Sequence, residues 1–456
     1  MTKQTWVVLP DLLSIRVFFG TGIMSALRER LDGRLTAIFL VPRDASSEWA
    51  GLVPGLTAID GHALTTGGGL PDRALARLDA LLDRQLGYHP LAIRLNYRHG
   101  FHGERMHAGH PNWMLDTNRD SRLPHRPSVE RAMERWFFSP RRHVPARLLE
   151  AMRRECSGLV LSNAQPASAV PFLVGARRLG LPVVAHVASW DHTVGKGVIS
   201  PYCGLYVVQN DVMQDDLRRY HGIAAERVRV TGWPQTDLLH RRRPRSAYES
   251  LLTRYALDPA RPVALVAGNT PSNAPYEGRF VERLLGWRDE SPTTRPQLLF
   301  RPHPRDRDWR ARFGAAAGRE GVAIQEASFT DLEDLATLLQ HADAVVCNAG
   351  TILLDALVGD RPAVCVLYDE GAPAGESWAA KNVVGKHYEE LAASGAFYRG
   401  RSFDEVVNGI EQALAQPDEL AAERRRAVEQ VVGTVDGRAA ERVVDTIAAG
   451  LRGGAT

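Results

Sequence analysis

AVVCNAGTILLDALVGDRPAVCV, residues 344–366, contains the alternation that decides the fold. The apolar run at 344–347 is typical of a buried strand, and the apolar run at 351–358 is typical of a short helix. A glycine-containing turn at 348–350 separates them, and a second apolar strand begins at 363. Strand, helix and strand in this order form a βαβ unit, which predicts a parallel sheet.

The same alternation continues along most of the chain. Before HRRRPRS at 240–246, strands are predicted at 5–10, 35–41, 158–163, 182–188, 204–210 and 228–232. After it, strands are predicted at 262–269, 296–304, 323–327, 344–348 and 363–369. Apolar strands interleaved with amphipathic helices are typical of parallel sheets with both faces covered. The predicted fold class is therefore α/β, with two doubly wound Rossmann-like domains that face each other across a cleft.

The domain boundaries follow from the length and from the charged segment at 240–246. A chain of 456 residues exceeds what one hydrophobic core usually organises, so two domains are expected. We predict an N-terminal domain at 1–245 and a C-terminal domain at 246–432, followed by a terminal helix within 433–456. An insert at 94–143, rich in arginine and histidine, interrupts the N-terminal domain.

The composition excludes several classes of protein. A hydrophobic content of 44% and a charged content of 24% are typical of soluble globular proteins. A net charge of +3 gives no reason to expect nucleic acid as a partner. The four cysteines have no CxxC spacing, which favours reduced core thiols over disulfides or zinc ligands. With neither a secretory signal nor an apolar run of ~20 residues, the expected location is the cytoplasm.

The insert at 94–143 allows three interpretations. The first is a metal site, but the four histidines near the start of the insert lack the i,i+4 spacing of a helical metal site; they are His99, His102, His107 and His110. A basic loop with aromatic residues could instead contact an anionic acceptor or the surface of a membrane. The third interpretation is a solvated variable loop.

The turn at the start of the helix at 351–358 predicts a nucleotide site. Asn348, Gly350 and Thr351 lie where unpaired backbone N–H groups and the helix dipole favour a phosphate. Asp355 follows one helical turn later and is placed to accept two hydrogen bonds from a ribose diol. The alternative is an acid that interacts with the helix dipole, worth about 0.5 kcal/mol.

Two further strand ends supply candidates for donor binding. In LLFRPHP (298–304), the guanidinium of Arg301 can bind phosphate oxygens bidentately and His303 can donate to the same group. The alternative is a turn in which prolines end the strand. In GNTPSNAP (268–275), a plain proline-stabilised loop is the alternative to a phosphate or sugar contact by Gly268, Asn269 and Thr270.

The first domain offers two acids at strand ends that could act as a general base. Asp11 follows the first strand, and Asp191 lies in SWDHTVGKG (189–197). We slightly favour Asp191, with His192 as a group that orients or replaces one of the acids. Either acid could instead cap backbone N–H groups in its turn. The same segment offers contacts to acceptor or phosphate through Trp190, Lys196 and Gly197.

Four of these segments resemble motifs of known families. AGTILLDALVGDRP (349–362) resembles the donor-nucleotide motif of GT-B fold glycosyltransferases, and LLFRPHP resembles the RPHP segment of CDP-glycerol glycerophosphotransferase-like enzymes. VTGWPQTD (230–237) resembles a turn of the nucleotide-sugar 2-epimerase superfamily. SWDHTVGKG resembles the SWDN-x-x-x-KG segment of bacterial surface-polysaccharide transferases, with His192 in place of the usual asparagine.

The resemblance implies a GT-B glycosyltransferase. The C-terminal domain would bind a nucleotide-sugar donor, the N-terminal domain would bind the acceptor, and the terminal helix would return to the N-terminal domain. The acceptor would be a small molecule, a lipid-linked molecule or a polysaccharide, and peripheral contact with the inner face of the membrane is compatible with it. Inversion of configuration is expected because one base suffices and no covalent nucleophile stands out. No cofactor is expected, and without a DxD pair at a strand end no metal is expected either.

Three alternatives remain open at this point. A CDP-glycerol-type polyol-phosphate transferase would release CMP instead of a nucleoside diphosphate. A nucleotide-sugar 2-epimerase would explain the turn at 230–237, although the acid- and histidine-rich loops of that group are not evident. A non-catalytic subunit would bind the nucleotide sugar without turnover.

Overall fold

The computed structural model describes residues 2–41, 49–66, 69–70, 72–75, 77–78, 135–136, 138–165, 167–194, 199–271, 273–326, 328, 331–373, 379, 383 and 386–453. These residues form two compact units. The first contains the described residues up to Gln235 and those from Arg438 onward, and the second runs from Thr236 to Gly437. The sequence predicted the first change of unit at 245. It lies earlier because the short helix α12 (Thr236–His240) packs against helices of the second unit.

A parallel sheet organises the first unit, with strands in the order β3-β2-β1-β4-β5-β6-β7. The strands are β1 (Gln4–Leu9), β2 (Leu35–Phe39), β3 (Thr57–Asp60), β4 (Cys156–Leu161), β5 (Val183–His186), β6 (Leu205–Val208) and β7 (Val228–Val230). All five residues of β2 are buried, as expected for a strand covered on both faces.

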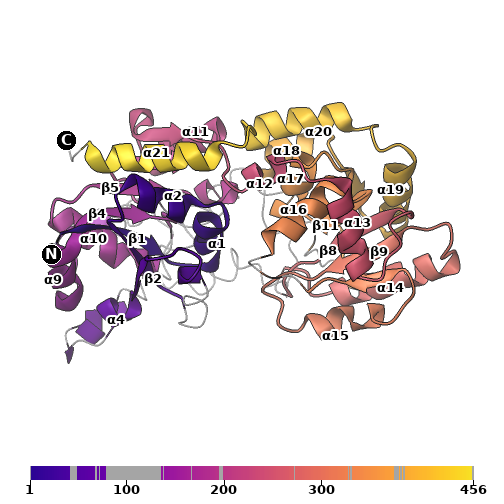
Figure 1. Ribbon diagram of the computed structural model, residues 1–456, viewed down its shortest axis with the longest axis horizontal. Coiled ribbons are helices and arrows are strands. Elements are labelled where there is room, and N and C mark those ends of the chain that lie inside the picture. Colours follow the sequence, from indigo (N-terminus) through magenta and orange to yellow (C-terminus); the bar gives the residue numbers. More distant parts are fainter. Residues whose placement is uncertain are drawn as a thin grey trace. The chain divides into compact units, whose positions relative to one another are not determined.

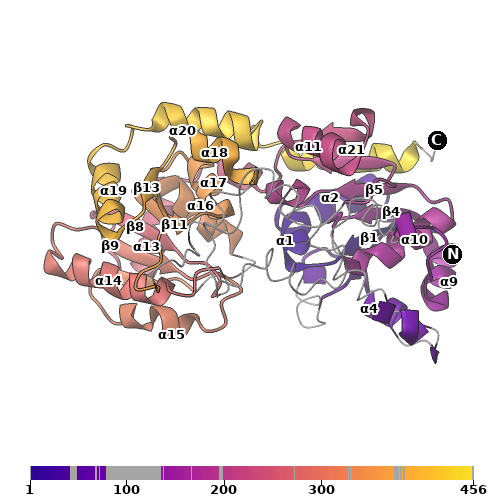
Figure 2. The same cartoon turned by 180° about the vertical axis from the view of Figure 1, so that it is seen from behind.

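Helices cover this sheet, and the last of them comes from the end of the chain (Figures 1 and 2). The helices and 3-10 turns are α1 (Leu12–Gly20), α2 (Ile23–Arg30), α4 (His62–Thr65), α9 (Ala146–Glu155), η1 (Ala167–Ala169), α10 (Val170–Arg178), η2 (Trp190–Thr193), α11 (Asp211–His221), η3 (Ala225–Arg227) and α21 (Ala439–Arg452). A Cβ added at Gly450 of α21 would lie 2.8 Å from the Leu205 side chain. The terminal helix therefore packs directly on the first sheet.

The second unit contains another parallel sheet, in the order β10-β9-β8-β11-β12-β13. The strands are β8 (Val263–Ala267), β9 (Gln297–Arg301), β10 (Val322–Ile324), β11 (Ala344–Asn348), β12 (Ala363–Val366) and β13 (Tyr398–Gly400). The quoted segment therefore forms the predicted βαβ unit, because β11 and β12 pair in parallel and the helix at 351–358 connects them.

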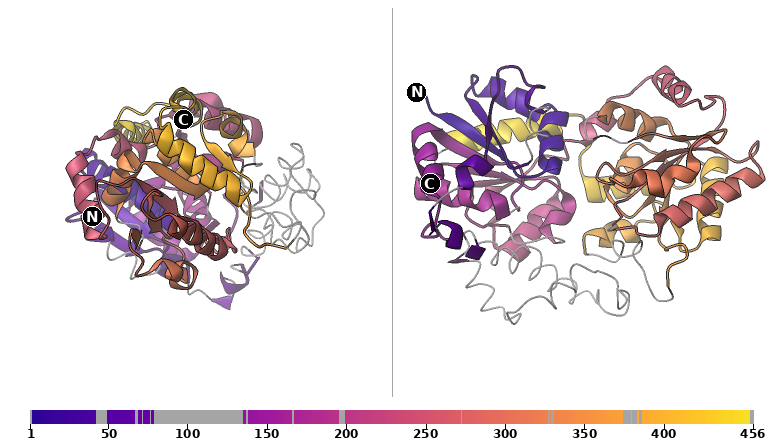
Figure 3. Two further views of the ribbon diagram at one scale, coloured as in Figure 1. Left: turned by 90° about the vertical axis from the view of Figure 1, so that its right-hand side faces the viewer. Right: turned by 90° about the horizontal axis from the view of Figure 1, so that it is seen from below.

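The second sheet also has helices on both faces (Figure 3). Its remaining helices are α13 (Arg245–Arg254), α14 (Glu277–Glu290), α15 (Trp309–Phe313), η4 (Gly314–Ala316), α16 (Leu332–His341), α17 (Thr351–Val358), η5 (Lys386–Tyr388), α18 (Glu389–Ala393), α19 (Phe403–Ala415), α20 (Ala421–Ala427) and the π-helical turn η6 (Val428–Val432). Phe280 and Ile410, from α14 and α19, share one core with Val266 and Val346 of the sheet. None of the helices in the described part of the chain is long and apolar enough to cross a membrane.

Each sheet has one position where the strand order reverses. In the first unit this position lies between β1 and β4, and in the second it lies between β8 and β11. Ligands of doubly wound sheets bind beyond the carboxyl ends of the strands at such a switch point. These two positions are therefore the places to look for a site.

Candidate functional site

A pocket lies at the switch point of the second sheet. It encloses about 360 Å³ of empty space, part of it open to solvent. The walls come from the carboxyl ends of β8, β11 and β12 and from the start of α14; the lining residues are Val266, Ala267, Ala274, Tyr276, Glu277, Phe280, Val346, Cys347, Asn348, Val366, Tyr368, Asp369, Glu370 and Ala379. The pocket thus occupies the position where this fold class binds nucleotides.

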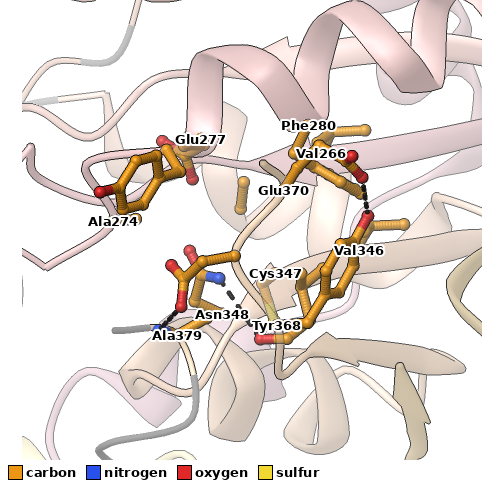
Figure 4. A pocket seen from close by; sticks show the side chains of 14 residues that line it. Val266, Ala274, Glu277, Phe280, Val346, Cys347, Asn348, Tyr368, Glu370 and Ala379 are labelled. Carbon is orange, nitrogen blue, oxygen red and sulfur yellow. Dashed lines mark hydrogen bonds between the residues drawn. The ribbon is translucent and has the colours of Figure 1, made fainter. Parts of the chain in front are cut away.

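The polar side chains of the pocket are held in place by neighbours (Figure 4). The Tyr368 hydroxyl donates to Glu370 at 3.0 Å, and the Ala379 N–H donates to Asp369 at 3.0 Å. Asn348 donates through Nδ2 to the Val366 carbonyl at 3.4 Å. Burial raises the pKa of the Tyr368 phenol, so it stays a hydrogen-bond donor at neutral pH.

The charge of the pocket limits what it can hold. Asp369 and Glu370 contribute carboxylates, Glu277 contributes a carboxyl group that Arg312 and the Asn269 N–H already contact, and none of the described residues that line the pocket is basic. Carboxylates accept hydrogen bonds from hydroxyl and amino groups and repel phosphate oxygens. The pocket therefore suits a group that carries hydroxyl or amino groups better than a phosphate.

The start of α17 adjoins the pocket through Asn348. Gly350 is the N-cap, with φ −160°, which any residue can adopt. A Cβ added there would meet nothing closer than the Asn348 carbonyl at 3.9 Å. Thr351 is exposed, whereas Asp355, one helical turn later, is buried. The ribose contact of Asp355 stays a prediction.

The sequence predicted that the Arg301 guanidinium binds phosphate oxygens, but in the structure acceptors of the protein itself bind it. Its guanidinium is buried and donates bidentately to Asp331, at 2.9 and 2.8 Å, and to Gln325 at 2.6 Å. It thereby connects the ends of β9 and β10 to the start of α16. His303 accepts the Arg305 N–H through Nδ1 at 3.0 Å. This contact belongs to a local turn after the strand, as in the alternative interpretation of RPHP.

The loop after β8 uses its own backbone donors internally. Asn269 N–H donates to Glu277, and Thr270 N–H donates to the Asn269 side chain at 2.8 Å. A Cβ at Gly268 would lie 2.7 Å from the Phe313 ring, so packing alone requires glycine there. These contacts support the alternative of a stabilised loop over phosphate contacts by Gly268, Asn269 and Thr270.

A buried charge cluster, which sequence analysis missed, fixes this loop. Arg312 donates to Glu277 at 2.6 Å, to Asp306 at 2.5 Å and to the Asn269 carbonyl at 2.9 Å. Glu277 and Arg312 therefore hold the Asn269 residue by its N–H and its C=O. No spacing in the sequence indicates the cluster, because its members come from three separate segments that only the fold brings together.

Glu277 should make stability depend on pH. Burial raises its pKa to about 8, and Asp306 adds to the effect although Arg312 opposes it. The folded chain therefore binds more protons than the unfolded chain between pH 4.5 and about 8, and the free energy of unfolding falls as pH rises through this window. In urea unfolding at pH 5 and pH 8, we expect Glu277→Gln to lose this dependence. Glu326→Gln, at an exposed pair, should keep it; equal slopes for all three proteins would contradict the assignment.

In the first unit, Asp11 caps a helix at the switch point. It accepts the Ser14 N–H at 2.8 Å as the N-cap of α1, with a reciprocal contact from Ser14. Its other oxygen accepts from Asn163, from the loop after β4, at 2.8 Å. Asp11 thus caps backbone N–H groups in its turn, which was the alternative to its role as a base.

Asp191 and His192 lie in η2 beyond the carboxyl end of β5. Ser189 donates to Asp191 at 2.6 Å, and His192 Nε2 lies 3.9 Å from the same carboxylate oxygen. Asp191 retains 22% of its side-chain exposure, whereas Trp190 and His192 are buried. Lys196 and Gly197 lie outside the described residues, as does most of the insert at 94–143, including His99, His102, His107 and His110.

Neighbouring elements hold η2 from two sides. Gln165 donates to the His192 carbonyl at 2.8 Å. From α11, Asp216 accepts the Thr193 hydroxyl at 2.7 Å, and His221 Nε2 contacts the Thr193 carbonyl at 2.8 Å. The structure thus places Asp191 on a fixed turn with part of its side chain exposed.

Comparison with solved structures agrees with this architecture. The chain is similar to the S. aureus MnaA-UDP co-structure, at 11% identity and TM-score 0.56 over 99% of this chain and 97% of that chain. It is also similar to UDP-GlcNAc 2-epimerase from Methanocaldococcus jannaschii, at 11% identity and TM-score 0.53 over 98% of this chain and 99% of that chain. At such low identity the likeness shows the fold alone, and that fold is GT-B.

Sequence comparison supplies the family. No curated protein matches the chain in sequence. The family model for CDP-Glycerol:Poly(glycerophosphate) glycerophosphotransferase, however, matches residues 189–449, which include η2 and the whole pocket of the second unit. The RPHP resemblance predicted this group of enzymes. Because the match spans more than half of its residues, the chain belongs to the CDP-glycerol:poly(glycerophosphate) glycerophosphotransferase family of transferases.

Proposed function

We propose that this enzyme transfers a phosphopolyol group from a CDP-activated polyol to an acceptor hydroxyl. The observation that carries the proposal is the family match over 189–449. In the proposed reaction the acceptor oxygen bonds to the phosphorus next to the polyol. The bond from that phosphorus to the bridging oxygen breaks, and CMP leaves with the electron pair. The proton of the acceptor hydroxyl passes to a base.

The two units contribute different parts of this reaction. The polyol or nucleoside hydroxyls occupy the acid-lined pocket, and the phosphates lie over Gly350 and Thr351, where helix N–H groups and the dipole favour them. Asp191 is the proposed base, since its carboxylate is partly exposed and held by Ser189. The reaction needs no cofactor beyond the donor. A lipid-linked or polymeric acceptor would bring the enzyme to the inner face of the membrane.

Glycosyl transfer from a nucleotide sugar is the second candidate. It is favoured by the likeness of SWDHTVGKG (189–197) to the segment of surface-polysaccharide transferases. The two reactions differ in the nucleotide that is released, because a glycosyltransferase normally leaves a nucleoside diphosphate.

Analysis of the released nucleotide separates them. The full chain is incubated with CDP-glycerol or with a panel of nucleotide sugars, each with a glycerophosphate oligomer as acceptor, and the nucleotides are resolved by chromatography. We expect acceptor-dependent CMP from CDP-glycerol. A nucleoside diphosphate released from a sugar donor, with no CMP, would support glycosyl transfer and contradict the first proposal.

A further inference from the structure

Tyr388 connects the segment after β12 to the turn at the start of α17. Its side chain is 1% exposed, and its hydroxyl donates to the Gly350 carbonyl at 2.9 Å. A buried tyrosine normally finds a partner for its hydroxyl, but many acceptors would serve. This hydroxyl is directed to the N-cap residue of the helix where the donor phosphates are proposed to bind.

The contact fixes the direction of one particular backbone donor. The peptide between Gly350 and Thr351 is planar and trans, so the Thr351 N–H points opposite to the Gly350 carbonyl. The carbonyl also accepts the Leu353 N–H at 3.2 Å. Tyr388 and Leu353 together hold it towards the protein, and the Thr351 N–H is therefore held away from them, on the side of the exposed Thr351.

None of the described residues crowds this peptide. Neither φ at Gly350 nor packing by the described residues requires glycine, since a Cβ added there would meet only the Asn348 carbonyl, at 3.9 Å. Gly359, at the other end of the helix, is the opposite case: a Cβ there would lie 1.9 Å from the Leu339 carbonyl. Packing therefore requires Gly359, whereas none of the described residues fills the place that a Cβ at Gly350 would take.

We propose that Tyr388 is a positioning residue for the donor: its hydroxyl orients the Gly350–Thr351 peptide so that the Thr351 N–H contacts a donor phosphate. This inference rests on the proposed function, which places the phosphates at α17. Tyr388 does not itself touch the donor. Its effect should therefore appear in ligands that carry phosphates and not in the nucleoside alone.

Thr351→Pro tests the contact directly. Proline at the first position of a helix is well tolerated and lacks the N–H, and the preceding Gly350 is already extended, as a residue before proline requires. Thr351→Val, which keeps the N–H and loses the hydroxyl, is the control for the side chain and should bind CDP like the wild type. By calorimetry on the full chain, we expect Thr351→Pro to weaken CDP binding about tenfold and Tyr388→Phe to weaken it about fivefold. Cytidine affinity should stay unchanged in both.

The double variant shows whether Tyr388 acts through Thr351. If it does, Tyr388→Phe causes no further loss of CDP affinity in the Thr351→Pro protein. Tyr398→Phe is the matched control, since it loses a hydroxyl bound to Glu419 at an exposed position and should bind CDP like the wild type. The inference would be overturned if the losses of CDP affinity in the two single variants add up in the double variant, or if Tyr388→Phe binds CDP like the wild type. A weaker CDP affinity of Thr351→Pro would still support the donor site in either case. Failure of the wild type to bind any nucleotide would instead refute the proposed function.

Discussion

Arg301→Ala is expected to destabilise the second unit by about 3 kcal/mol, because removing one partner of a buried ion pair leaves the other charge poorly compensated. The value is at the low end for such pairs, since Asp331 retains 21% exposure. Gln325 also loses its partner. Urea unfolding of the variant and the wild type measures the difference.

Arg310→Ala provides the matched control. Arg310 pairs with Glu326 in the same unit, but both side chains are more than 60% exposed, so its loss should change stability by less than about 1 kcal/mol. The interpretation from sequence, a phosphate clamp, predicts another result for Arg301→Ala. If Arg301→Ala unfolds at the same urea concentration as the wild type and loses more affinity for CDP than for cytidine, the result would support the phosphate clamp and contradict the structural role.

Asp191→Asn is expected to lower the transfer rate by roughly 10²–10⁴-fold, the contribution typical of a general base. Asparagine keeps the size of the side chain and an oxygen that can accept from Ser189, so the turn η2 should stay folded. The donor KM should change little because Asp191 contacts the acceptor in the proposed reaction. Steady-state kinetics with CDP-glycerol give both parameters.

Two other variants complete the test of the base. Asp11→Asn should keep most of the rate, because asparagine is as good an N-cap as aspartate. His192→Gln removes the third titratable side chain proposed for this step. If the transfer rate falls further in His192→Gln than in Asp191→Asn, the imidazole of His192 is the base. If activity is lost only in Asp11→Asn, Asp11 is the base.

The fold could be predicted because its signal is repeated. Most of the buried parallel strands are apolar runs followed by a helical pattern. The strand at 344–347 and the helix at 351–358 appear in the structure as β11 and α17. The boundary between the two units was predicted less accurately. The charged segment at 240–246 suggests a linker, yet Arg243 is buried against Glu333, so the segment belongs to the second unit.

The candidate site could be predicted only in part. Strand ends near the switch points indicated Asn348 and Asp191, since topology alone places such residues at the ligand edge. The roles of charged side chains could not be predicted, because a lone arginine in a motif does not show its partner. Arg301 pairs with Asp331, which lies thirty positions later in the sequence, and Glu277 pairs with Arg312, thirty-five positions later.

The most direct test of the central claim is a crystal structure of the chain with CDP bound. The account predicts the nucleotide at the carboxyl ends of β8 and β11, with its phosphates within hydrogen-bond distance of the Thr351 N–H and its hydroxyl-bearing part in the acid-lined pocket. A nucleotide bound at the carboxyl edge of the first sheet instead, beside Asp11 and Asn163, would contradict it.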